Sequence, residues 1–79
     1  MLVLGDVSAA RLLYQRAATL GSARAATAVG KTYDPVFLAS IHATGIPADR
    51  GAAAEWYRKG AALGDREGTA SLARLSRAQ

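Results

Sequence analysis

The stretch Ala54–Asp65, AEWYRKGAALGD, decides the fold of this chain because an earlier segment repeats its pattern. It carries an aromatic pair, two basic residues and several alanines, and it closes on a Leu-Gly step. Shifting the chain by 43 residues places the stretch on Arg11–Ser22, where the apolar, small and glycine positions recur. Tyr14 then coincides with Tyr57, and the Leu-Gly steps coincide as well. A repeated unit of this length is typical of helix pairs that stack into a solenoid.

Capping residues, glycines and prolines divide the chain into helices. Candidate N-caps stand at intervals, and a glycine follows two of the helical segments. We expect helices over about 6–19, 22–33, 35–44, 49–63 and 65–77, capped at Asp6, Ser22, Asp34, Asp49 and Asp65. Gly21 and Gly64 stand where a left-handed residue ends a helix. No segment has the pattern of a strand, so the predicted fold class is all-α.

Apolar residues recur at helical spacing and predict the faces that pack together. The expected inward positions are Ala10, Leu13, Tyr14, Ala17 and Leu20, then Ala26, Val29, Gly30 and Tyr33, then Ala53, Trp56, Tyr57, Gly60 and Leu63, and finally Leu72 and Leu75. Small residues among them let backbones approach, and the large ones fill the remaining space. If Trp56 is buried in this way, its replacement by alanine costs about 3–5 kcal/mol.

The same residues resemble the Sel-one-like repeat family, whose members are related to tetratricopeptide repeats. The second helix of that repeat is matched by Asp49, Ala53, Trp56, Tyr57, Lys59, Ala61 and Gly64, the first by Ala26, Val29, Gly30 and Tyr33, and the loop by Gly45-Ile46. Gly60 stands where the family has alanine, a loss of about 1 kcal/mol in helix propensity unless another backbone crosses closely there.

The resemblance implies an architecture and a function. The architecture is a short α/α solenoid of about five helices in a single domain over 1–79. In it, 6–21 is the second helix of a partial repeat, 22–64 a full repeat, and 65–79 the first helix of a further one. The implied function is a non-catalytic protein–protein interaction module, with self-pairing or flanking repeats expected to cover the ends. The chain can also be a piece of a longer repeat protein.

One segment departs from the family pattern. Residues 34–44, DPVFLASIHAT, are longer than the family loop and predict an extra short helix inserted in the central repeat. Val36, Phe37, Leu38 and Ile41 are more apolar than a surface loop requires. Two interpretations stay open: the four residues cap the core, or they form a candidate partner-binding patch.

The positive charge raises the alternative of a polyanion-binding domain. The chain has a net charge of +4, and its ten Lys and Arg residues are scattered. The cluster Trp56-Tyr57-Arg58-Lys59 has three interpretations: an exposed nucleic-acid patch, a spacer within the core, or a buried ring pair whose Tyr57 hydroxyl reaches the surface. Because neighbouring positions on a helix face different ways, we favour the spacer and do not expect nucleic acid as the partner.

Catalytic, metal and cofactor sites are not expected. The chain has no cysteine, and His42 is its only histidine, without carboxylates at helical spacing. The six acidic residues mostly stand at expected N-caps, and no glycine-rich phosphate loop occurs. No apolar run approaches the length of a membrane span. The absence of cysteine leaves the compartment open, with the cytoplasm favoured over the periplasm.

Overall fold

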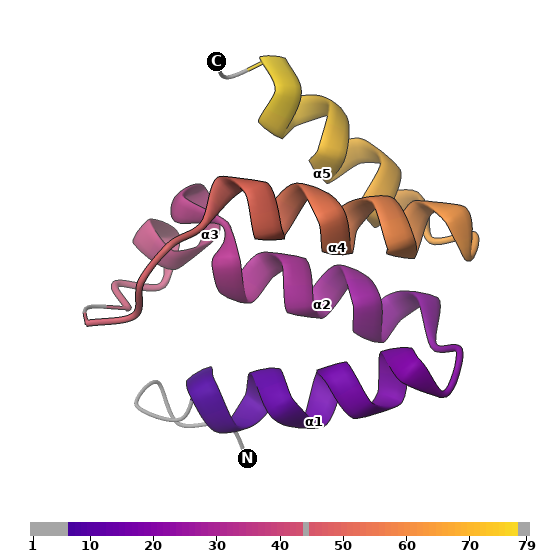
Figure 1. The fold of residues 1–79 in the computed structure, drawn as a ribbon. Coiled ribbons are helices and arrows are strands. Elements are labelled where there is room, and N and C mark those ends of the chain that lie inside the picture. Colours follow the sequence, from indigo (N-terminus) through magenta and orange to yellow (C-terminus); the bar gives the residue numbers. More distant parts are fainter. Residues whose placement is uncertain (1–6, 44, 78–79) are drawn as a thin grey trace.

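Within the part of the chain that the structure describes, five helices form one stacked layer. The computed structural model describes residues 7–43 and 45–77. The helices are α1 (Val7–Thr19), α2 (Ala23–Tyr33), α3 (Pro35–Ser40), α4 (Arg50–Ala62) and α5 (Arg66–Arg77). In Figure 1, α1, α2 and α4 lie side by side, α5 crosses beyond α4, and α3 lies at the end of α2. The predicted all-α solenoid-like class, with a short helix from the inserted segment, is confirmed.

Local capping explains where the helices begin. The Ser22 hydroxyl accepts a hydrogen bond from the Ala25 amide at 3.1 Å and starts α2. Asp49 starts α4 by accepting from the Ala52 amide at 3.0 Å. Each bond satisfies an amide that lacks a partner in the first helical turn. The expected cap Asp6 lies outside the described residues.

The helix of the inserted segment is shorter than its sequence predicts. It begins at Pro35 as expected but ends at Ser40 rather than at about 44. His42 takes a φ of 54°, in the left-handed region, and the Ala43 amide donates to the Leu38 carbonyl at 3.0 Å. This reversal ends the helix in the way a glycine normally would. Position 44 itself lies outside the described residues.

The core is centred where α2 meets α4. Ala26 and Val29 of α2 and Ala53 and Tyr57 of α4 are each 0% exposed. The Tyr33 ring packs at the edge of this core and is covered by the Arg11 guanidinium, 3.7 Å from the ring centroid. Arg11 also bonds the hydroxyl and carbonyl of Thr32, which ties α1 to the end of α2.

Four of the expected inward residues are exposed, and for them the prediction is wrong. Leu13 is 68% exposed and Leu20 84%, while Tyr14 and Leu63 are also exposed. The 43-residue repeat places Leu13 on α1 where α4 has Trp56. Within the described residues, however, α4 packs between two helices, whereas α1 packs on α2 alone. The apolar stripe of α1 is wide enough to pack against two helices, so half of it stays exposed to solvent.

Small residues let the helices approach closely, as the sequence predicts. A Cβ atom at Gly30 would lie 2.5 Å from the Tyr57 ring. A Cβ atom at Gly60 would lie 2.2 Å from the Thr27 Oγ1 and 3.1 Å from the Thr27 amide nitrogen. The condition attached to Gly60, that another backbone crosses there, is thus met. Gly68 on α5 approaches the same threonine, so α4 and α5 both pack closely against Thr27 of α2.

We expect Gly60→Ala and Gly68→Ala each to lower the free energy of unfolding by about 1–3 kcal/mol, because the added methyl overlaps α2 or α4. Thr27→Ala should recover part of the loss at Gly60, where the closest atom is the threonine hydroxyl. It should recover less at Gly68, whose other close neighbours are backbone atoms of α4 at 2.9 and 3.0 Å. Circular dichroism during urea unfolding measures five proteins: the unchanged chain, the two glycine variants, and each glycine variant combined with Thr27→Ala. Equal recovery at both sites would contradict this geometry.

Candidate partner-binding groove

The aromatic pair of α4 separates onto two sides of the helix. Tyr57 is 0% exposed and points into the core, which confirms the spacer interpretation for this residue. Trp56 is only half-buried, and the Lys59 ammonium lies 4.5 Å from the centroid of its ring. The expectation of a buried Trp56 is therefore wrong in part. Because adjacent helical residues point about 100° apart, Trp56 cannot share the central position of Tyr57, and it borders an open hollow together with Ala26 of α2.

The buried carboxylate of Asp34 joins α3, α4 and α5. Asp34 is 0% exposed and stands between α2 and α3. Its Oδ2 accepts hydrogen bonds from the Tyr57 hydroxyl at 2.7 Å and from Arg74 at 2.6 Å. Its Oδ1 accepts from the Val36 amide at 2.9 Å, which makes Asp34 the N-cap of α3. The sequence predicts only this cap, because Tyr57 and Arg74 are 23 and 40 residues away.

These contacts shift the protonation of the buried groups. Burial alone would raise the pKa of Asp34, but the hydrogen bonds from Arg74, Tyr57 and the Val36 amide outweigh it and lower the pKa. Burial and the hydrogen bond to Asp34 raise the pKa of the Tyr57 phenol. Both carboxylate oxygens accept hydrogen bonds from the protein, so Asp34 stays ionised and its role is to stabilise the fold.

We expect stability to fall at both ends of the pH range. A lowered carboxyl pKa stabilises the fold above the unfolded value of about 4, and this contribution disappears as pH falls through the folded pKa. A raised phenol pKa acts in the opposite sense, so its contribution disappears above about pH 10. Thermal melts across pH should show that Asp34→Asn flattens the acid limb and Tyr57→Phe the alkaline limb. Unchanged limbs in both variants would refute this assignment.

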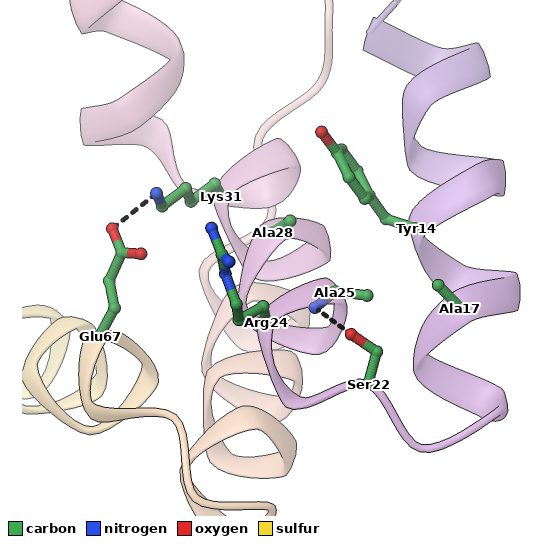
Figure 2. A pocket seen from close by; sticks show the side chains of 8 residues that line it. All are labelled: Tyr14, Ala17, Ser22, Arg24, Ala25, Ala28, Lys31 and Glu67. Carbon is green, nitrogen blue, oxygen red and sulfur yellow. Dashed lines mark hydrogen bonds and ion pairs between the residues drawn. The ribbon is translucent and has the colours of Figure 1, made fainter.

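A groove runs along the exposed side of α2. Three adjoining hollows, of about 460, 360 and 320 Å³, share Lys31 as a lining residue. The first lies between α1 and α2 and reaches Glu67 of α5 (Figure 2). The second lies between α3 and α5, and the third between α1 and α3. We call these three hollows together the α2 groove.

The candidate patch of the inserted segment divides between this groove and the core. Val36, 52% exposed, and the half-buried Phe37 and Ile41 line the groove. Leu38 is 4% exposed and packs inside, so a partner cannot reach it. Leu38 thus covers the core, as the first interpretation expects, whereas Val36, Phe37 and Ile41 lie at the groove, where a partner-binding role stays a prediction.

Charged side chains surround the middle of the groove. Arg24 and Lys31 extend from the same side of α2 (Figure 2). The Lys31 ammonium lies 2.6 Å from a carboxylate oxygen of Glu67 and 5.6 Å from the centroid of the Phe37 ring. Arg74 lines the second hollow and donates to Asp34. Positive groups therefore outnumber negative ones along the accessible wall.

Nothing in the described part of the chain gathers the residues of a metal site. Within it, no group of three or more His, Asp or Glu side chains is close enough to hold an ion. His42 is exposed at the end of α3 and acts through its backbone. None of the helices in the described ranges has the length and apolar character needed to cross a bilayer.

Comparison with protein families now identifies the repeat. The pattern of the Sel1 repeat matches residues 2–22 and 36–65. The chain belongs to the Sel1 repeat family. Sel1 repeats are helical modules that generally mediate protein–protein interactions. No curated protein and no solved structure gives a significant match.

The two Sel1 matches leave out α2 and begin again at Val36, within the segment treated above as an insert. In space, α2 nevertheless packs against α4 more extensively than any other two helices of the described residues pack together, with Gly30 against Tyr57. The Sel1 pattern thus runs through α3 in sequence, while α2 supplies the neighbouring helix in the fold. Residues of α3 line two of the three hollows, so α3 lies at the edge of the groove.

Proposed function

We propose that this Sel1 repeat chain is a non-catalytic interaction module that binds a segment of a partner protein in the α2 groove. The carrying observation is that all five helices of the described residues border one open groove, with apolar side chains accessible along α3. Val36, Phe37 and Ile41 would contact the apolar side chains of the partner. Leu38 would support α3 from inside.

The position of the apolar side chains supports this proposal. Val36 is exposed although α3 has a buried side on which Leu38 packs. Phe37 lines two of the three hollows and therefore stands at their junction. Tyr14 of α1 also lines two hollows, which extends the accessible aromatic surface across α2. Aromatic side chains in partly enclosed positions are typical of the residues that contribute most to interfaces.

A displayed random-peptide library selected on the immobilised 79-residue protein tests the proposal. We expect enriched peptides whose affinity falls about tenfold or more in the double variant Val36→Ser/Phe37→Ser. The matched control is Leu20→Ser/Leu63→Ser, which removes two exposed apolar side chains outside the groove. Circular dichroism establishes that each variant is folded, and Val36→Ser alone serves if the double variant is not. Failure to enrich any peptide, or equal losses in both double variants, would refute the proposal.

A further inference from the structure

The charges of the α2 groove restrict the chemistry of what can bind there. Arg24, Lys31 and Arg74 line its hollows, and Glu67 is the single acidic residue among the lining side chains. Arg74 already donates to the buried Asp34. Within the described residues, Arg24 has no ion-pair partner, although it points to the same side of α2 as Lys31.

Lys31 is the central charged residue of the α2 groove because it borders all three of the hollows that form it. Its ammonium is held by the Glu67 carboxylate at 2.6 Å, and the Glu67 side chain is 58% exposed. An ion pair so open to solvent is weak and exchanges its partner readily. Glu67 therefore shows how a carboxylate fits this position, and a carboxylate from another molecule can take its place without unfolding any element.

An apolar hollow lies directly beside that carboxylate position. It has a volume of about 320 Å³ and is bordered by Val7, Ala10, Ala28, Phe37 and Ile41 as well as by Lys31. The Phe37 ring lies 5.6 Å from the Lys31 ammonium, so the cationic and apolar parts adjoin. A ligand that fits both parts carries an acidic group next to a large apolar side chain.

We propose that the α2 groove binds an acidic linear peptide in which Asp or Glu lies beside an aromatic or branched apolar residue. The peptide carboxylate displaces Glu67 from Lys31, with Arg24 adding positive charge, and the apolar side chain enters the hollow beside Phe37. Glu67 then acts as an internal competitor that lowers affinity in the free protein. This inference rests on the proposed function and names the chemistry of the partner segment.

Peptides enriched in the selection described above provide the probe. We expect Asp or Glu next to Phe, Leu or Ile in these peptides, measured against the unselected library. Fluorescence anisotropy with one labelled enriched peptide should show about two- to fivefold weaker binding to Lys31→Gln and about two- to fivefold tighter binding to Glu67→Gln. The matched controls Lys59→Gln and Glu55→Gln make the same charge changes on α4 outside the groove and should leave affinity unchanged.

The outcomes separate this inference from the proposed function. Enriched neutral or basic peptides that still lose affinity in Val36→Ser/Phe37→Ser would overturn the acidic ligand and leave the groove as the binding site. Weaker binding to Glu67→Gln would overturn its role as competitor. A single-stranded oligonucleotide that binds more tightly than the peptide, and loses affinity in Lys31→Gln, would show a general polyanion surface and also overturn the inference. A selection without enriched peptides refutes both proposals.

Discussion

Replacing Tyr57 by alanine is expected to lower the free energy of unfolding by about 3–5 kcal/mol, which is enough to unfold a domain of this size. The Tyr57 ring is 0% exposed and packs on Gly30, and its hydroxyl donates to Asp34 at 2.7 Å. The substitution removes the largest fully buried side chain and leaves a cavity between α2 and α4. Far-ultraviolet circular dichroism during urea unfolding measures the loss.

Trp56→Ala is the informative comparison for this prediction. The two residues are neighbours on α4, but Trp56 is half-buried, with the Lys59 ammonium 4.5 Å from its ring centroid at the border of an open hollow. We expect a loss of only about 1–2 kcal/mol for the tryptophan. A loss at Trp56 equal to that at Tyr57 would mean that the core extends to the opposite side of α4. Tyr57→Phe should also cost only about 1–2 kcal/mol, because it keeps the buried ring and removes only the hydrogen bond.

Asp34→Ala is expected to have the second largest effect, about 2–4 kcal/mol. It removes the N-cap of α3 and leaves the buried Tyr57 hydroxyl without its acceptor. Arg74 is less affected, since its side chain is 41% exposed and can be hydrated. Thermal unfolding of the purified variants gives the difference, and one kcal/mol corresponds to a shift of about 4–8 °C for a domain of this length.

Two further variants distinguish the parts of this effect. Asp34→Asn keeps the capping oxygen but replaces the second oxygen by an NH2 group, which can donate to the Tyr57 hydroxyl instead of accepting from it. Its loss should therefore be smaller than that of Asp34→Ala. Combining Asp34→Ala with Tyr57→Phe should cost less than the sum of the two single changes, because the second removes the unpaired hydroxyl. Additive losses would show that the hydroxyl does not depend on Asp34. The hydrogen bond between Tyr57 and Asp34 would then contribute nothing to the free energy of unfolding.

The candidate site was predicted from sequence only in outline. The unusual apolar character of the inserted segment pointed to Val36, Phe37 and Ile41, which line the groove. It could not separate them from Leu38, because a short helix has a buried and an accessible side that depend on its neighbours. Lys31 and Glu67 carried no local signal, since a scattered charge acquires meaning only from what folds beside it.

The sequence by itself determined the helices of the described residues, apart from the end of α3, together with the caps Ser22, Asp34 and Asp49 and the Sel1 repeat. These features depend on contacts within a few residues of one another, as between Asp49 and the Ala52 amide, or on a pattern that recurs at a constant distance. For Gly60 it set only a condition, that glycine costs helix propensity unless another backbone crosses closely there, and the α2 backbone meets this condition.

Only the tertiary structure decided which parts of each apolar stripe are covered. Equivalent repeat positions have different numbers of neighbours in the described residues, so Leu13 is exposed on α1 while Trp56 is half-buried on α4. The Asp34–Tyr57–Arg74 cluster likewise forms from residues up to 40 positions apart. Burial and long-range pairing are properties of stacked helices, and no single segment contains the information that sets them.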